Sequence, residues 1–163
     1  MAFYYIDVAT NERVLLKTYD VGLGRIDATQ ASGSQTPLGK YLLGNKIGIY
    51  KKGDLGYYLD QKLEMIQIFG TRWIPFEKEI ENCTLPAKGF GIHGAPWKKG
   101  PDGQIVEQRV SVGCYESDGC IRLLSEDMEE LFSIVVTKPT YVEIVKDVKF
   151  AELPGREVKT STY

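Results

Sequence analysis

The chain has 163 residues, of which 43% are hydrophobic and 26% charged, a composition typical of a globular protein long enough to build a core without disulfide or metal cross-links. Its formal net charge of −2, without any run of Lys or Arg, excludes a basic surface for nucleic acid or anionic membranes. No apolar stretch approaches the roughly 18 to 20 residues of a membrane span, the first residues do not have the pattern of a signal peptide, and a single histidine excludes the usual Cys/His zinc patterns.

The first half of the chain predicts short β-strands. Residues 3–8 and 14–19 are rich in aromatic and β-branched residues on either side of a polar turn, which is the pattern of a β-hairpin. Pro37 and Gly39 then give a turn signal in front of an aromatic strand, because proline fixes φ and glycine reaches conformations closed to other residues. Glycines divide the next part into strands expected at 41–50, 55–59 and 63–69. Short strands at this spacing favour a β-sandwich or barrel over a helical fold.

The middle of the chain predicts one strand between two loops. Residues 71–88 carry prolines and aromatic side chains, and we expect them to form a surface loop with an aromatic anchor in the core, with a loop packed over a groove as the alternative. A strand at 91–93 should present His93 from a rigid sheet. Residues 95–104 contain the turn signal Pro101-Asp102-Gly103 and are expected to form an exposed loop.

A helix is predicted further along the chain. Ser125 is a hydroxyl residue suited to the N-cap, and the two acidic residues after it place negative charge where the helix dipole favours it. Apolar residues recur at the spacing of one helical face, which should pack on the sheet: Met128, Leu131, Phe132 and Val135. Pro139 ends the helix, and a strand is expected at 140–145 before a polar tail.

The candidate chemistry depends on one histidine and two cysteines. A thiol nucleophile needs a base near neutral pH, because a free thiol with a pKa of roughly 8.5 is mostly protonated. His93 is the only histidine, so it is the base if the protein is a thiol enzyme. Cys114 and Cys120 each end a Ser-x-Gly-Cys tetrapeptide, which leaves the choice of nucleophile open. Structural burial of these side chains is the alternative that the residues also allow.

Several motifs in a fixed order favour catalysis over burial. The chain contains Thr36-Pro37-Leu38-Gly39-Lys40-Tyr41, then Ile92-His93-Gly94, and then Ser111-Val112-Gly113 followed by Ser117-Asp118-Gly119-Cys120-Ile121-Arg122. With these motifs the sequence resembles the catalytic domain of the L,D-transpeptidases (YkuD type). The resemblance spans nearly the whole chain, assigns the nucleophile to Cys120 and makes Cys114 a spacer residue.

The resemblance implies a fold and a domain organisation. The expected fold is mainly β, an L,D-transpeptidase-like β-sandwich or curved barrel with one amphipathic helix after the catalytic cysteine. It predicts a single catalytic domain over residues 1–150 and a polar C-terminal tail at 151–163.

The resemblance also implies an activity. Such enzymes take a stem tetrapeptide of peptidoglycan as acyl donor, release the terminal D-alanine and pass the acyl group to an amine through a thioester. The amine belongs to another stem, which cross-links the wall and supports cell shape, or to a lipoprotein that is anchored to the wall. We therefore expect a protein of the bacterial cell envelope that carbapenems acylate and that needs no metal or organic cofactor.

Four residues are assigned to catalysis. Cys120 is the nucleophile, His93 is the base, and the resemblance gives Gly94 the backbone carbonyl that orients the imidazole. Backbone N–H groups around Gly119 and Cys120 are candidate donors to the oxyanion.

Substrate binding is assigned to three further residues. Arg122 is a fixed cation that could bind a substrate carboxylate bidentately, with a structural ion pair as the alternative. Ser117 belongs to the cysteine motif, and Trp97 lies in the loop after the histidine.

One residue departs from the family pattern. The family usually has a histidine before the Gly-Cys pair, where this chain has Asp118. A carboxylate there would raise the pKa of the thiol unless it points away or is paired, for example with Arg122. An L,D-carboxypeptidase on the same scaffold and a non-catalytic wall-binding domain are the alternative functions.

Overall fold

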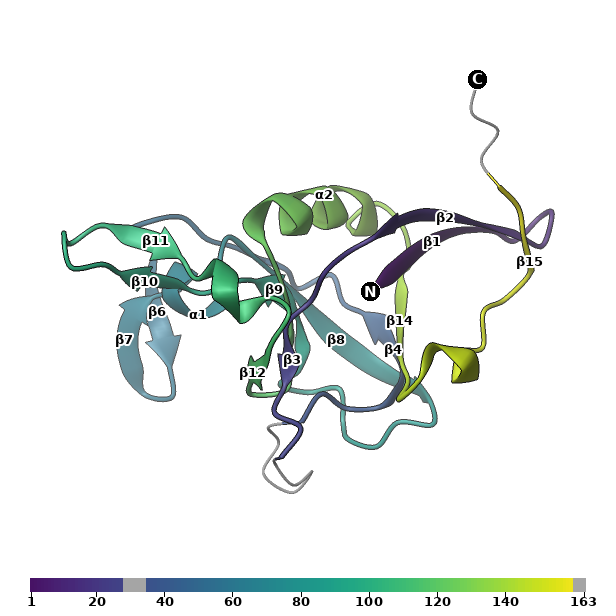
Figure 1. The fold of residues 1–163 in the computed structure, drawn as a ribbon, viewed down its shortest axis with the longest axis horizontal. Coiled ribbons are helices and arrows are strands. Elements are labelled where there is room, and N and C mark those ends of the chain that lie inside the picture. The colour runs from purple at the N-terminus through teal and green to yellow at the C-terminus, as the bar shows by residue number, and fades with distance from the viewer. Residues whose placement is uncertain (28–34, 160–163) are drawn as a thin grey trace.

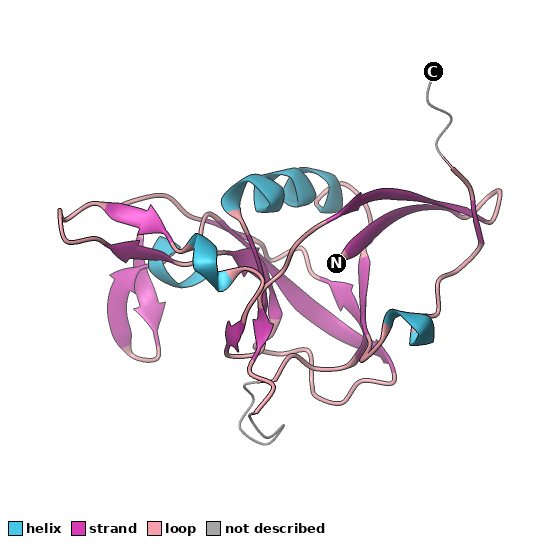
Figure 2. Cartoon of the chain, in the orientation of Figure 1, coloured by secondary structure: helices cyan, strands magenta, loops and turns pink. Residues whose placement is uncertain are grey.

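The computed structural model describes residues 1–27 and 35–159. Figures 1 and 2 show that β-strands are the predominant regular structure in these residues and that helices are few. The strands are β1 (Ala2–Asp7), β2 (Glu12–Thr18), β3 (Leu23–Gly24), β4 (Gly39–Leu43), β5 (Gly48–Ile49), β6 (Leu55–Tyr58), β7 (Gln61–Glu64), β8 (Arg72–Glu81), β9 (Gly91–Gly94), β10 (Trp97–Lys99), β11 (Ile105–Glu107), β12 (Tyr115–Ser117), β13 (Ile121–Leu123), β14 (Tyr141–Ile144) and β15 (Arg156–Glu157). The helices are α1 (Ile66–Phe69) and α2 (Ser125–Val135), with 3-10 helices η2 (Arg109–Ser111) and η3 (Val148–Phe150).

Six strands form the central sheet, which curls into a half-barrel. The strand order is β13-β9-β8-β4-β14, and β5 pairs with a further part of β8. Strands β13 and β9 run parallel, whereas the other pairs of this sheet are antiparallel. The predicted mainly β fold is confirmed, and α2 is the amphipathic helix after the cysteine motif.

The centre of this sheet is β8, so the predicted surface loop at 71–88 is wrong for residues 72–81, whereas residues 82–88 form neither strand nor helix. β8 has ten residues and pairs with both β9 and β4. Ile74 is 1% exposed and Phe76 is 4% exposed, which is the alternation of a strand with one buried face. Pro75 is tolerated because proline lacks only the N–H donor, and its carbonyl still accepts a hydrogen bond from Gly44 N at 2.8 Å.

Two shorter segments also differ from the sequence prediction. The predicted strand at 63–69 ends early, because residues 66–69 form α1. The predicted exposed loop at 95–104 is largely a hairpin, in which β10 and β11 pair antiparallel. Its Pro-Asp-Gly turn signal lies at the hairpin tip, where Gly103 N donates to Gly100 O at 3.0 Å.

The sheet has one core face and one opposite face. Ile121, Ile92 and Ile74 are register partners across β13, β9 and β8, and they are buried in the core beside α2. The next set of partners, Arg122, His93 and Trp73, must project from the other face, because successive strand residues alternate. The sheet therefore separates the packed core from the candidate site.

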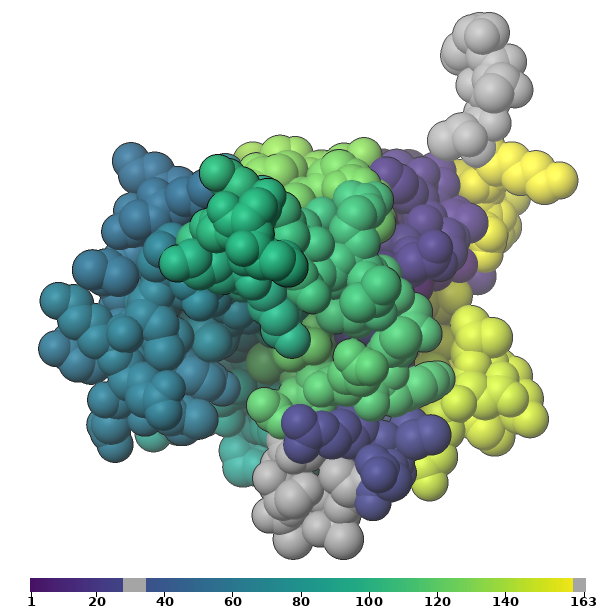
Figure 3. Space-filling view, turned by 60° about the vertical axis from the view of Figure 1, so that its left-hand side comes forward, coloured from purple at the N-terminus to yellow at the C-terminus, as the bar shows by residue number. Residues whose placement is uncertain are grey.

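The C-terminal segment of the described chain lies against the N-terminal hairpin. β1 and β2 form the predicted N-terminal hairpin, and β15 pairs in parallel with β2. Figure 3 shows the purple N-terminal and yellow C-terminal segments in contact. The predicted polar tail at 151–163 thus includes a short strand, while residues 160–163 lie outside the described part. Within the described residues, no helix has the length and apolar composition to cross a membrane.

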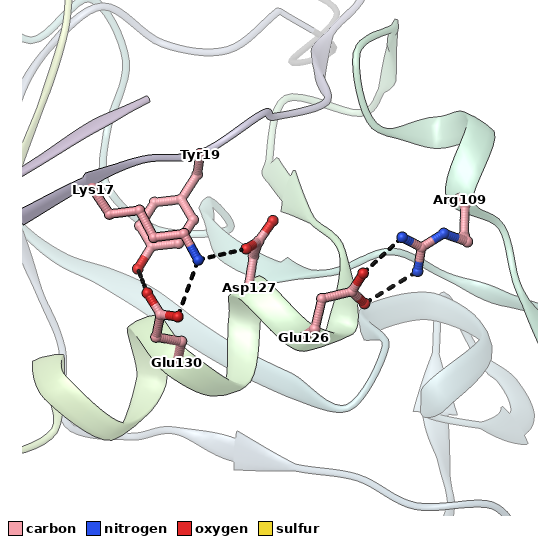
Figure 4. A network of polar contacts seen from close by, with 6 residues as sticks. All are labelled: Lys17, Tyr19, Arg109, Glu126, Asp127 and Glu130. Atoms are coloured by element: carbon pink, nitrogen blue, oxygen red, sulfur yellow. Dashed lines mark hydrogen bonds and ion pairs between the residues drawn. The ribbon is translucent and has the colours of Figure 1, made fainter.

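Acidic side chains of helix α2 form ion pairs and hydrogen bonds with residues outside the helix, as Figure 4 shows. Lys17 Nζ lies 3.1 Å from Asp127 and 3.0 Å from Glu130, and Tyr19 OH donates to Glu130 at 2.9 Å. The predicted Ser125 N-cap is wrong: Leu124 occupies the N-cap position and Ser125 is already helical.

Candidate active site

A cavity of about 520 Å³ lies on the face of the sheet opposite α2. Figure 3 shows a hollow between the blue segments around β6 and α1 and the green segments that follow β9. Its lining residues are Tyr58, Gln67, Ile68, Phe69, Trp73, Gly89, His93, Pro96, Lys98, Gln108, Val110, Ser111, Glu116, Asp118, Cys120 and Arg122. A smaller cavity of about 290 Å³ lies between β4, β14 and η3, and its lining includes no histidine or cysteine.

His93 is held in one orientation inside the larger cavity. The residue is 4% exposed, and its Nδ1 lies 2.7 Å from the carbonyl oxygen of Gly94. A carbonyl can only accept, so in the neutral ring Nδ1 carries the proton and Nε2 keeps a free lone pair. The backbone contact expected of Gly94 is therefore present, and it leaves Nε2 available as a base.

Aromatic rings keep water away from this imidazole. The His93 ring lies 5.5 Å from Phe69 at an angle of 90° and 5.9 Å from Trp73. Burial lowers the pKa of His93 to about 4; the hydrogen bond to Gly94 opposes this shift and the Arg122 cation adds to it. Sequence reasoning missed Phe69 and Trp73, because strand pairing of a segment predicted as a loop brings Trp73 to His93.

Cys120 lies at the same cavity as His93. It directly precedes β13, in which Arg122 is the register partner of His93, and residues two apart share a face of a strand. Its Sγ lies 3.8 Å from the carbonyl oxygen of Gly89. Cys114 is not among the lining residues. The structure thus brings Cys120, and not Cys114, to the histidine.

The Cys120 thiol is electrically neutral at physiological pH. Burial raises its pKa to about 11, although the Gly91 N–H and the Arg122 cation lower it, and Asp118 raises it further. His93 is also neutral because its pKa is lowered. The pair therefore rests as a neutral thiol and a neutral imidazole.

Ser117 and Gly119 shape the turn in front of the cysteine. Ser117 is 1% exposed; its Oγ donates to the Cys120 carbonyl at 2.6 Å and accepts from the Gly119 N–H at 3.2 Å. Gly119 has a φ of 105°, which disfavours other residues. Ser117 thus lies within the turn and not in the cavity wall, and the Gly119 N–H already has an acceptor.

Asp118 and Arg122 are not paired with each other. Asp118 instead forms an ion pair with Arg25, in which Oδ1 of Asp118 lies 3.2 Å from Nη2 of Arg25 and both side chains are exposed. Arg122 is half-buried in the cavity wall, and none of the ion pairs among the described residues includes it. Its Nε is buried without a hydrogen-bond partner in the described residues. A half-buried guanidinium in this state is suited to an incoming carboxylate.

Other residues around the cavity lie outside the sequence motifs. Tyr58 reaches it from β6, and burial raises the pKa of its phenol, with Asp118 and Cys120 adding to the shift. Lys98 lines the cavity, whereas its neighbour Trp97 does not and instead lies 5.4 Å under the Lys52 ammonium. Among the described residues, no three His, Cys, Asp or Glu side chains cluster so as to hold a metal ion.

Comparison with protein families identifies a catalytic-domain family. The family model of the YkuD L,D-transpeptidase catalytic domain matches residues 3–144. No curated protein matches the chain.

Proposed function

The chain belongs to the L,D-transpeptidase catalytic domain family, and from this premise we propose that it is a cysteine acyltransferase acting on peptidoglycan stem tetrapeptides. The family acts on peptidoglycan peptides in cell-wall metabolism at the cell envelope. The observation that carries the proposal is the shared position of His93 and Cys120 on one cavity, with Nδ1 of His93 fixed by Gly94. The family match ends close to residue 150, the predicted end of the catalytic domain, and that boundary stays a prediction.

The first half-reaction acylates the cysteine. Nε2 of His93 takes the thiol proton as Sγ of Cys120 attacks the carbonyl of the third stem residue, and a C–S bond forms. The tetrahedral oxyanion collapses, the C–N bond to D-alanine breaks, and the imidazolium returns the proton to the leaving amine. A thioester and free D-alanine result, and His93 is again neutral.

The second half-reaction transfers the acyl group. An acceptor amine attacks the thioester carbonyl, His93 takes the amine proton, and the departing sulfur recovers a proton as the C–S bond breaks. The acceptor is the amine of another stem peptide or of a lipoprotein to be anchored. The products are a new amide bond and the resting thiol.

Two features of the cavity support recognition of the donor peptide. The terminal D-alanine of a stem tetrapeptide carries a carboxylate, and Arg122 offers a half-buried guanidinium without an ion pair in the described residues. The Cys120 N–H is our candidate donor to the oxyanion, because the Gly119 N–H donates to Ser117. An oxyanion role for Gly119 and substrate contacts for Ser117 and Trp97 stay predictions.

The test is intact-protein mass after incubation with a carbapenem and, separately, with a disaccharide-tetrapeptide. Wild type and Cys114→Ala should gain the mass of one acyl group, Cys120→Ala should gain none, and His93→Gln should be acylated more slowly. Product analysis with an added amine then separates transpeptidation from hydrolysis by a carboxypeptidase. A wild-type protein with reduced Cys120 that forms neither adduct would contradict the proposal and favour a non-catalytic wall-binding domain.

A further inference from the structure

Residues 21–25, here called the clamp segment, lie between the two arms of the loop that carries Cys120. The first arm contacts the segment through Gly113 N, which donates to Val21 O at 3.1 Å, and through Cys114 O, which accepts from Leu23 N at 2.9 Å. On the second arm, Gly22 and Arg122 exchange two backbone hydrogen bonds of 2.8 Å each. The clamp segment therefore fixes the positions of both arms relative to each other.

Close packing leaves the clamp segment little freedom to shift. A Cβ placed on Gly22 would lie 2.1 Å from the carbonyl oxygen of Ser111 in η2. Gly24 N donates to Thr36 Oγ1 at 2.8 Å, and β3 pairs in parallel with β12. Arg25, the last residue of the segment, thus extends from a well-held backbone towards the cysteine turn.

Arg25 meets that turn at Asp118. The two side chains form an ion pair of 3.2 Å at the cavity rim and are 51% and 64% exposed. Asp118 lines the cavity, as do Cys120 and Arg122. Two cations, Arg25 and Arg122, are therefore available to one carboxylate, and the structure shows it bound to the outer one.

Which arginine pairs with Asp118 matters because charged and polar groups surround the Cys120 thiol. They are Asp118 and Arg122 on its own segment, Glu116 on β12, His93 on β9, Tyr58 on β6, Lys98 on β10 and Arg25 after β3. Arg122 favours the thiolate of Cys120, and Asp118 opposes it. If Asp118 lost its ion pair with Arg25, its carboxylate would disfavour the Cys120 thiolate with no paired cation to offset the charge. Alternatively, it would move onto Arg122 and occupy the guanidinium.

We propose that Arg25 is a positioning residue that holds Asp118 at the rim, away from Arg122, so that its negative charge opposes ionisation of Cys120 less than an unpaired carboxylate would and does not block the cation that faces the cavity. This inference rests on the proposed function in taking Cys120 as the nucleophile. It explains how the chain accommodates an acidic residue two positions before that cysteine.

The test measures the alkylation rate of Cys120 by iodoacetamide at pH 8, followed by peptide mass mapping so that Cys83 and Cys114 are scored separately. Arg25→Gln should slow Cys120 roughly two- to four-fold, the size expected when a partly exposed charge loses its partner. Asp118→Asn should speed it, Arg25→Lys should largely restore the wild-type rate, and about 1 M salt should reduce the Arg25→Gln effect by screening.

The double variant separates charge positioning from structural damage. Arg25→Gln combined with Asp118→Asn should react like Asp118→Asn alone, because no carboxylate is left to position. Arg156→Gln is the matched control, because Arg156 is also an exposed arginine paired with a carboxylate, that of Glu12. This variant should leave the alkylation rate of Cys120 unchanged. An unchanged rate in Arg25→Gln, or an equal loss in the Asp118→Asn background, would overturn the inference.

Donor kinetics give a second readout. With a tetrapeptide donor, Arg25→Gln should raise KM more than it lowers kcat, because Asp118 then competes with the substrate carboxylate for Arg122. Alkylation needs no peptidoglycan substrate. A wild type that fails to turn over the donor would therefore count against the proposed function, while the alkylation rates would still decide the role of Arg25.

Discussion

The carboxylate of Glu107 accepts a hydrogen bond from the backbone N–H of Ser125 at 2.6 Å, and so caps the start of α2 from another part of the chain. Its second oxygen lies 3.1 Å from Arg109, which also pairs with Glu126 in the first turn of α2. Figure 4 shows the Arg109–Glu126 pair. Hairpin β10–β11, which borders the cavity, is thereby attached to the helix behind the sheet.

This capping arrangement gives opposite expectations for two residues. Glu107→Ala should lower the free energy of unfolding by about 1 kcal/mol, the usual effect of losing a cap. Ser125→Ala should stay within about 0.5 kcal/mol of wild type, because its Oγ has no hydrogen-bond partner in the described residues and alanine is the better helix former. Urea unfolding measures both. A larger loss in Ser125→Ala than in Glu107→Ala would contradict the cap.

Stability should fall in mildly acidic solution because of His93. Burial lowers the pKa of His93 in the folded protein to about 4, against about 6.5 for a histidine in an unfolded chain, so the unfolded chain binds a proton that the folded chain excludes. The stabilisation is complete above about pH 6.5 and is lost as the pH falls towards 4, by up to about 3 kcal/mol.

The measurement is the unfolding free energy of wild type and His93→Gln between pH 7.5 and 4.5. The variant removes the only histidine, so its curve should be flatter over this range while the carboxylates remain as in wild type. Parallel curves would show that His93 does not titrate in this way.

Reactivity of Cys120 should follow that of a protonated thiol. Since burial raises its pKa to about 11, the rate of alkylation should increase roughly tenfold per pH unit between pH 7 and 10. A preformed thiolate–imidazolium pair would instead give a rate nearly independent of pH over this range. Iodoacetamide labelling with peptide mapping distinguishes the two, with Cys114→Ala as a control on assignment.

Loss of the Ser117 hydroxyl should loosen the cysteine turn. Ser117→Ala removes the donor to the Cys120 carbonyl and the acceptor for the Gly119 N–H in a buried position, and should cost about 1 to 3 kcal/mol of stability. It should also slow acylation of Cys120. Ser133→Ala is the matched control: its Oγ bonds the Glu130 carbonyl at 2.7 Å on the exposed side of α2, so little change is expected.

Local patterns in the sequence were sufficient for several elements. The N-terminal hairpin, the strand of His93 and the apolar face of α2 each follow from residues within a few positions of one another, which set turns and periodicity. The ordered motifs also sufficed for the family, which the matching model over residues 3–144 confirms.

Other features depended on partners distant in the sequence. Residues 71–88 read as a loop because Pro75 interrupts the strand pattern, yet pairing with β4 and β9 places β8 at the centre of the sheet. The same pairing brings Trp73 to His93 and helps to exclude water from the imidazole. No sequence pattern near Trp73 predicts that it lies beside His93.

By itself the sequence determined the class of fold, the family and the residue types available for chemistry, because these are carried by short motifs and by periodic apolar residues. Only the tertiary structure decided that Asp118 pairs with Arg25 rather than Arg122, that Glu107 caps the helix, and that His93 and Cys120 are both neutral. The physical reason is that ion pairing, capping and desolvation depend on which distant segments pack together, and each of these contacts joins residues that lie apart in the sequence.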